Sequence, residues 1–176
     1  MKKYNKCSQF PLPCAFPIPE PPEIQSGFRA VRSTTNTPQA ITAATITQVQ
    51  YPNEQYDLRN EYTPLATLPP TIPASTFIPK SNGIYDIIAS VLFATTVATP
   101  AAAYNLLISI TVNNTAVASN SELTAEANNA ISVSTNIQLK AGDQVQVFIT
   151  SAEAGSITSN PAFTHFEATR LPSPTI

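Results

Sequence analysis

The sequence is poor in charged residues and has no tryptophan. Its 176 residues include 9 Lys or Arg and 11 Asp or Glu, so the charged fraction is 11% and the net charge is −2. A typical soluble domain is charged at about a quarter of its positions. Nucleic-acid binding needs clustered Lys and Arg that neutralise phosphates, and here the basic residues are few and scattered. We therefore expect no nucleic-acid partner.

The sequence has one histidine, His165, in a strand-like stretch between Phe163 and Phe166. A catalytic triad needs its histidine beside a nucleophile and a carboxylate, and no nucleophile signature is present. We predict a packing or hydrogen-bonding role for His165, no enzyme and no cofactor. An enzyme that uses His165 or an acidic loop is the least favoured hypothesis.

That acidic loop contains Glu54, Asp57 and Glu61. The three residues can be interpreted as paired acids, as a calcium site or as solvated loop carboxylates. Calcium takes six to eight oxygen ligands, which this sparse set does not visibly supply. Solvated carboxylates are the favoured interpretation, and calcium stays a minor alternative.

Long apolar runs are absent. A membrane-spanning helix needs about 20 consecutive apolar residues, and no segment approaches this length, so we expect no membrane span. Met1, Lys2 and Lys3 imitate the charged start of a secretory signal, but prolines interrupt the apolar stretch that follows. We therefore expect no signal peptide and synthesis in a reducing cytoplasm.

The sequence contains two cysteines, Cys7 and Cys14. They lack the spacing and the partner histidines of a zinc site, so we expect no bound metal. Two interpretations remain open. The cysteines are either inert thiols or, once they meet an oxidising exterior, they form disulfides within one N-terminal segment or to an adjacent subunit. We favour the disulfide.

The first 24 residues differ from the rest because prolines alternate with apolar residues. Proline fixes φ and removes a backbone donor, so this arm should be extended rather than helical. It is either a disordered spacer or a connector that docks into a groove, for which its apolar side chains are suited. We interpret residues 1–24 as a connector or anchor arm. Its assembly residues would be Phe10, Leu12, Phe16 and Ile18.

From Gly27 onward apolar and polar residues alternate with a period of two, which predicts half-buried strands. We predict a head over residues 27–171, a short tail over 172–176, and an all-β fold of two antiparallel sheets, a sandwich or jelly roll. The inward rows are expected to be Tyr85, Ile87, Ala89, Val91 and Phe93; Tyr104, Leu106, Ile108, Ile110 and Val112; Ile131, Val133, Ile137 and Leu139; and Val145, Val147 and Ile149.

Other segments carry weaker signals. Residues 28–32, 41–49 and 163–171 are strand candidates. Prolines in residues 51–80 exclude a central strand there, so we expect a long loop or an edge region. Residues 119–129 are polar and rich in alanine, and we expect a loop or one short helical turn.

Several patches, taken in order, resemble the complement-type globular head family, which has the tumour-necrosis-factor-like jelly roll. They are the segments 28–32, 56–62, 77–86 and 139–145, within a resemblance that covers residues 27–171. Gly83 and Gly142 suit positions of close backbone approach or positive φ, and Asp143 can bond the amides of its own turn. The motif positions are Tyr56, Asp57, Gly83, Tyr85, Gly142 and Asp143.

The resemblance implies a homotrimer around a threefold axis, without indicating which sheet faces that axis. The arm is similar, less specifically, to the N-terminal connectors of subunits that build appendages on bacterial endospores, where the connector docks on the next subunit. This implies a spore-surface location without a secretory signal. The chain departs from the animal members of the head family because it lacks a collagen-like stalk and has its cysteines in the arm.

The leading functional hypothesis is a structural, self-assembling subunit of a surface fibre or coat, with an anchoring surface protein as a further partner. The alternative is a ligand-binding, adhesin-like head at a fibre tip, which the arm would anchor. In the first case the arm joins one trimer to the next, and in the second the protein stays as single trimers.

Overall fold

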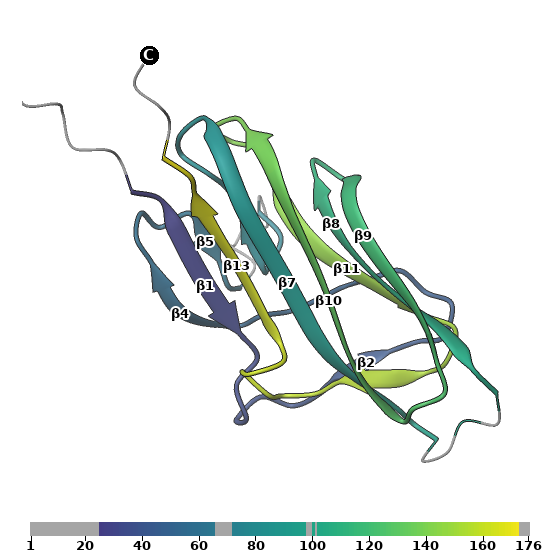
Figure 1. The fold of residues 1–176 in the computed structure, drawn as a ribbon. Coiled ribbons are helices and arrows are strands. Elements are labelled where there is room, and N and C mark those ends of the chain that lie inside the picture. The colour runs from purple at the N-terminus through teal and green to yellow at the C-terminus, as the bar shows by residue number, and fades with distance from the viewer. Residues whose placement is uncertain (1–24, 66–71, 98–99, 101, 173–176) are drawn as a thin grey trace, which may run out of the picture.

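The computed structural model describes residues 25–65, 72–97, 100 and 102–172. Within this part of the chain there are strands β1 to β13 and no helix. All strand pairs are antiparallel, and the strands form a seven-stranded and a six-stranded sheet that lie face to face (Figure 1). The predicted all-β fold of two antiparallel sheets is confirmed.

We call the seven-stranded layer sheet A. Its central strand is β7 (Gly83–Thr95), which pairs along its whole length with β10 (Asn128–Leu139). The other edge of β7 pairs first with β13 (His165–Arg170) and then with β12 (Gly155–Ile157). Three strands complete the sheet: β1 (Gly27–Val31) beside β13, β4 (Asn53–Asp57) beside β1, and β2 (Gln39–Ile41) beside β12.

The six-stranded layer is sheet B. Its longest strands are β8 (Tyr104–Val112) and β9 (Thr115–Thr124), which pair with each other. The other edge of β8 pairs with β11 (Val145–Ser151). Three strands of two residues each complete the sheet: β3 (Thr47–Gln48) and β6 (Thr76–Phe77) beside β11, and β5 (Tyr62–Thr63) beside β6.

The core lies between the two sheets and consists of the alternating residues that the sequence assigned to it. The inward row of β7, from Tyr85 to Phe93, is fully buried. The rows of the other long strands are buried too, with Val112 and Ile137 partly exposed at the margin. Because side chains alternate along a strand, these rows put the polar residues between them on the outer faces.

One end of the core is aromatic. The ring of Phe28 lies 4.6 Å from Tyr62 and 4.7 Å from Phe77 in stacked geometry, and 4.9 Å from Phe166 edge-on. Such pairs contribute about 0.5–1.5 kcal/mol each beyond their buried area. Phe28 and Phe166 belong to sheet A, and Tyr62 and Phe77 to sheet B, so this cluster joins the two layers.

Two local expectations are wrong. Residues 119–129, expected as a loop or helical turn, belong mostly to β9 and to the start of β10. Polar pairs replace the missing apolar alternation: the Ser109 and Ser119 hydroxyls lie 2.9 Å apart, and the Ser121 hydroxyl donates to Asn105 over 2.7 Å. Residues 115–124 therefore form a strand because β8 pairs with them, although their own sequence does not alternate.

The second error concerns residues 41–49, expected as one strand. The chain instead leaves β2 in sheet A, passes Ala44 at a φ of 56°, and enters β3 in sheet B. Residues 28–32 and 163–171 do form strands, β1 and β13. The proline-rich stretch 51–80 holds no long strand within its described part; β4 and β5 lie at the edges of their sheets, and β6 is two residues long.

The head has two ends, which we name for the argument below. β1, β7 and β11 begin, and β8, β10 and β13 finish, at one end, as their registers show. We call this end the arm pole, because residues 1–24 join the head there, and the opposite end the far pole. The predicted arm and tail, with Phe10, Leu12, Phe16, Ile18, Cys7 and Cys14, lie outside the described residues, except that 172 is described.

Candidate assembly surface

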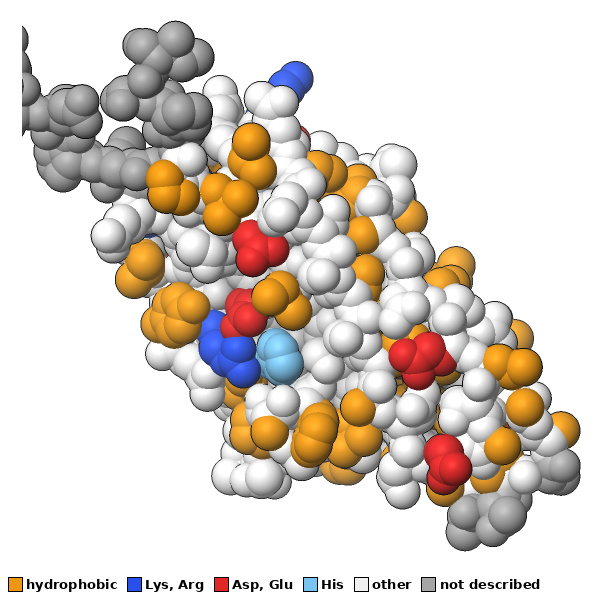
Figure 2. All heavy atoms as spheres, in the orientation of Figure 1, with side chains coloured by type: hydrophobic (Ala, Val, Ile, Leu, Met, Phe, Trp, Pro, Cys, Tyr) orange, Lys and Arg blue, Asp and Glu red, His pale blue; other side chains and the backbone are white. Residues whose placement is uncertain are grey.

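The outer face of sheet A carries an aliphatic strip along its central strand. Ile84 is 51% exposed, and Ile88 and Leu92 are partly exposed, on the side of β7 opposite to the buried Tyr85 row. Asp86 and Ser90 lie between these three residues in the same phase of the strand. A sheet face that meets water normally shows polar residues at such alternate positions. Figure 2 views this face and shows scattered apolar side chains on a largely uncharged surface. The strip lies in the middle of the sheet rather than at an edge.

Small side chains flank the strip on β10. Ala130 lies opposite Leu92, Ser132 opposite Ser90 and Ser134 opposite Ile88. These β10 residues are all exposed. Because these three side chains are short, another protein surface can approach Ile88 and Leu92 closely from this side, whereas Gln138 lies opposite Ile84.

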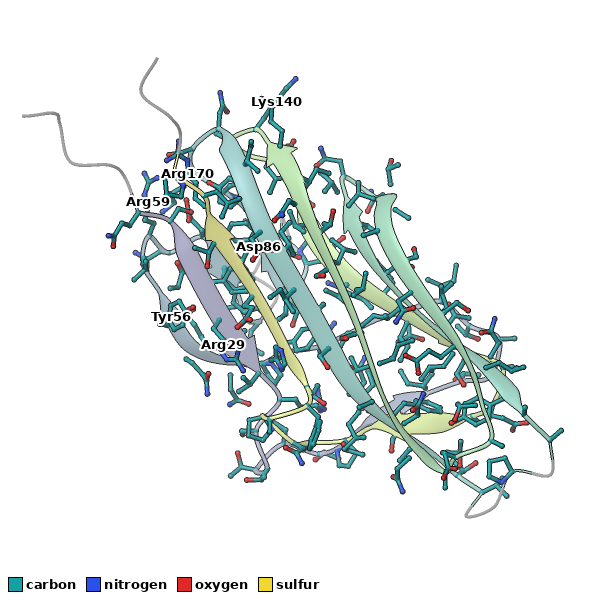
Figure 3. The ribbon with its side chains drawn as sticks, in the orientation of Figure 1. Arg29, Tyr56, Arg59, Asp86, Lys140 and Arg170 are labelled. Carbon is teal, nitrogen blue, oxygen red and sulfur yellow. The ribbon has the colours of Figure 1, made fainter. Side chains whose placement is uncertain are left out.

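The other flank of the strip holds an ion pair. Glu167 on β13 lies opposite both Ile88 and Arg29 on β1, and the Arg29 guanidinium pairs with the Glu167 carboxylate. The Arg29 Nε donates to the Gln55 side chain over 3.0 Å. Figure 3 shows Arg29 on β1, Tyr56 on the adjacent strand β4, and Asp86 on β7, which β13 separates from β1. The pair cancels its own charge, so this flank stays nearly neutral.

His165 lies on the same face, opposite Ser90 on β7 and Val31 on β1. Burial lowers the pKa of His165, the positive charge of Arg29 lowers it further, and Glu167 opposes both effects. Its buried Nδ1 has no hydrogen-bond partner in the described part of the chain. A triad base would be oriented there by a carboxylate, so this geometry does not support the enzyme hypothesis.

The motifs of the family resemblance meet at the arm pole. The Gly142 amide donates to the Pro79 carbonyl over 2.9 Å, and the Ala141 amide donates to the Asn82 side chain over 2.8 Å. The Lys80 amide donates to Glu61 over 2.7 Å. Hydrogen bonds therefore join three separate segments at the end of the head where the arm begins. The segments are 56–62, 77–86 and 139–145.

Glu61 is the centre of this pole. Its side chain has no exposed surface, and its carboxylate accepts a 2.5 Å hydrogen bond from Ser26, next to the arm, as well as the Lys80 amide. Arg59 lies 3.7 Å away. A buried carboxylate is tolerated when it is paired and hydrogen-bonded, so Glu61 has the partners it needs. It ties the first described residues of the chain to the loop after β4.

The remaining motif positions have structural contacts of their own. Asp57 accepts the Tyr62 amide over 2.7 Å, and Asp143 accepts the Lys140 amide over 2.7 Å. Gly142 has a φ of 92°, which favours glycine. Tyr85 is buried in the core, and burial raises the pKa of its hydroxyl, which donates to the Ser81 carbonyl over 2.9 Å.

Two motif positions face outward or adjoin a long side chain. Tyr56 is 44% exposed on β4. Gly83 begins β7 against the Arg170 side chain, where a Cβ would meet the Arg170 stem. Neither position contains a chemical group set that points to a reaction.

The acidic residues Glu54, Asp57 and Glu61 all lie within the described head. Among the described residues, no group of three or more His, Cys, Asp or Glu side chains is placed to hold an ion. The Asp57 and Glu61 oxygens already accept hydrogen bonds from the head's own amides and hydroxyls. The described residues also contain no helix long and apolar enough to cross a bilayer.

The strip of Ile84, Ile88 and Leu92 was not predicted from the sequence. A usable signal was present, because these three residues are apolar in the phase that Asp86 and Ser90 share, where a solvent-facing strand carries polar residues. Apolar residues in both phases are typical of a strand that is covered on both faces. The prediction assigned one face of it to the core and left the other without a role.

Comparison with known proteins identifies the fold. No protein-family model and no curated protein matches the chain. Among solved structures, murine APRIL at pH 5.0 is 16% identical, with a TM-score of 0.57, and its structure at pH 8.5 is 17% identical, with a TM-score of 0.54; each alignment covers 84% of this chain and 100% of that chain. Identity this low establishes the fold alone. The described head is a tumour-necrosis-factor-like jelly roll.

Proposed function

We propose that this chain is a non-enzymatic structural subunit, whose heads assemble as a homotrimer through the outer face of sheet A. The observation that carries the proposal is the strip of Ile84, Ile88 and Leu92 on β7, which no described part of the chain covers. Exposed apolar surface on a sheet centre marks an interaction site when the flanks are polar and neutral. The small residues of β10 and the neutralised Arg29–Glu167 pair form such flanks.

The proposal extends to the arm, which joins each trimer to the next and so builds a fibre or coat. The hydrogen bonds that hold β1 at the arm pole support this role. β1 pairs with β13 on one edge and β4 on the other, and Glu61 fastens Ser26. A pull on the arm along β1 would have to shear both ladders at once rather than unzip them singly.

The positions of the two cysteines determine which disulfides the proposed assembly can form. Both cysteines of the chain are in the arm, so a disulfide can form within one arm or between two arms, and never between an arm and a head. Disulfides between arms would make the fibre sensitive to reductant. We place the assembly at a bacterial spore surface, with an anchoring surface protein at its base, on the resemblance of the arm alone.

Deletion of residues 1–24 tests the division of roles. We expect the truncated chain to sediment as trimers, because the sheet A face is intact, and to form no fibres in negative-stain electron microscopy. The full chain should form fibres under the same conditions. Fibres that persist after the deletion would refute the connector role, and monomers of both chains would refute the trimer.

A ligand-binding head at a fibre tip is the second candidate. The observation in its favour is a hollow on the outer face of sheet B, lined by Ile46, Leu107 and Phe148 among others. This candidate requires the full chain to stay as single trimers at every concentration and to bind a partner on a glycan or surface-protein array. Concentration-dependent growth beyond the trimer would exclude it.

A further inference from the structure

The outer face of sheet B contains an apolar groove. One hollow of about 290 Å³ is lined by Ile46, Leu107 and Phe148, together with small residues of β8 and β9. A second of about 270 Å³ adjoins it, shares Leu107 and Thr150 with it, and reaches Asn105 and Ala152. Asn105 and Ala152 are at the far pole, beside the ends of β8 and β11 that lie away from the arm. Because the two hollows share lining residues, we treat them as one groove, whose end at Asn105 and Ala152 lies at the far pole.

The chemistry of the groove is uniform. None of the residues that line either hollow is charged. Ile46 stands at the rim with 74% of its surface exposed, and Phe148 supplies an aromatic wall. The polar groups of the lining are hydroxyls and amides, among them Thr111, Asn114 and Thr150. Extended, proline-rich segments bind to grooves of this kind, in which aromatic and aliphatic walls receive their side chains.

We propose that this groove receives the N-terminal arm of another copy of the chain, between Phe10 and Ile18. This inference rests on the proposed function, because it names the site at which the proposed connector docks. The ten residues from Phe10 to Pro19 contain no charged side chain and hold the arm's apolar residues, so the segment matches the uncharged groove. The charged residues of the arm, among them Lys2, Lys3, Lys6, Glu20 and Glu23, flank this segment on both sides.

The length of the arm and its starting point favour another copy over the same head. An extended proline-rich chain rises about 3.1 Å per residue. Ile18 is seven positions before Gln25 and Phe10 fifteen, so these side chains can reach roughly 20 Å and 45 Å beyond the arm pole. Pro17, Pro19, Pro21 and Pro22 stiffen the part nearest the head and oppose a turn back along it. A head stacked on the arm pole by its far pole would present the open end of its groove to the arm.

Substitutions at the groove test the docking in the full chain. Ile46→Lys removes an exposed rim residue and adds a charge, and Ala116→Arg fills the groove with a long charged side chain; both residues are exposed, so folding should be preserved. We expect each variant to remain trimeric but to need an about tenfold higher concentration to form fibres. The matched control is Leu65→Lys, at a position 67% exposed after β5 and outside the lining of both hollows, which should form fibres as the unmodified chain does.

A cross-link identifies the occupant directly. Full-length chain with a photoreactive phenylalanine analogue at Phe16 is assembled from a mixture of ¹⁴N and ¹⁵N protein, irradiated and digested. We expect mixed-isotope cross-links to peptides that contain Leu107 or Phe148. Cross-links within one isotope only would place the arm in its own head and overturn the inference, as would cross-links confined to sheet A or to other arms.

The two proposals fail in different ways. If deletion of residues 1–24 leaves the fibres intact, the connector function is wrong. If the deletion abolishes fibres, but Ile46→Lys and Ala116→Arg assemble as readily as Leu65→Lys, the connector function stands and the groove is not its receptor.

Discussion

The two outer faces of this sandwich differ in the side chains that they present. Sheet A presents the aliphatic residues of β7, with Asp86 and Ser90 between them, small β10 side chains and the Arg29–Glu167 ion pair. Sheet B presents two hollows with no charged lining residue. Exposed aliphatic side chains on a sheet suit a contact with another head, whereas a groove suits one extended segment. The same fold therefore carries two kinds of surface, one on each layer, that need not compete.

The largest expected effect separates these two faces. Ile88→Lys puts a long charged side chain into the middle of the sheet A strip, where a trimer would have to bury it. The acid opposite position 88, Glu167, already pairs with Arg29. We expect the trimer dissociation constant to rise by about 100-fold or more, measured by sedimentation equilibrium. The same change at Ile46 on sheet B should leave the trimer intact. If Ile46→Lys dissociates the trimer and Ile88→Lys does not, the assignment of the faces is reversed.

A smaller effect concerns the single histidine of the sheet A face. We expect the NMR titration midpoint of His165 to lie below 6.5, because burial and Arg29 lower its pKa. Arg29→Met should raise this midpoint and Glu167→Gln should lower it, in opposite directions because their charges act oppositely. Equal shifts in both variants would contradict the electrostatic description of this face.

The same pKa shift gives a pH dependence of folding. The folded state binds a proton at His165 less readily than the unfolded state does, because its His165 pKa is lower. The free energy of unfolding is therefore not reduced by His165 above pH 6.5, and it decreases as the pH falls from 6.5 toward the folded pKa. Urea unfolding at several pH values should show a weaker dependence in this range for His165→Gln than for the unmodified chain.

The smallest expected effect is on sheet B. Ser109→Ala removes the 2.9 Å hydroxyl contact with Ser119 between β8 and β9. Cross-strand polar pairs at exposed positions contribute about 0.2–1 kcal/mol, so we expect urea unfolding to show a loss in the lower part of that range. Trimers should be unaffected. A loss of trimers in this variant would mean that the sheet B face contributes to the threefold contact.

Much of the head could be predicted because its signals are local. The alternation of Tyr85, Ile87 and Val91 required one buried face, whatever the strand paired with. The turn at Gly142 and Asp143 carried its own backbone chemistry, a positive φ and an acceptor for the Lys140 amide. These features depend on residues within a few positions of one another.

Other features could not be predicted, because they depend on partners far away in the sequence. β9 is a strand because β8 pairs with it. Residues 41–49 are divided between two strands because β2 pairs within sheet A and β3 within sheet B. The candidate surfaces belong to this class. Ile46, Leu107 and Phe148 come from separate segments, and their spacing in the sequence does not predict that they line one groove.

The sequence by itself determined an all-β chain with a buried alternating face, a turn at Gly142 and a proline-rich leader whose residues 10–19 are uncharged. These properties follow from side-chain periodicity and from the restricted φ of proline, which act over short stretches of chain. Only the tertiary structure decided which outer face carries the aliphatic strip and which carries the groove, and that β1 begins beside Glu61 at one pole. Surface relief is set by strand order and register across the sheets, and these depend on contacts between residues distant along the chain.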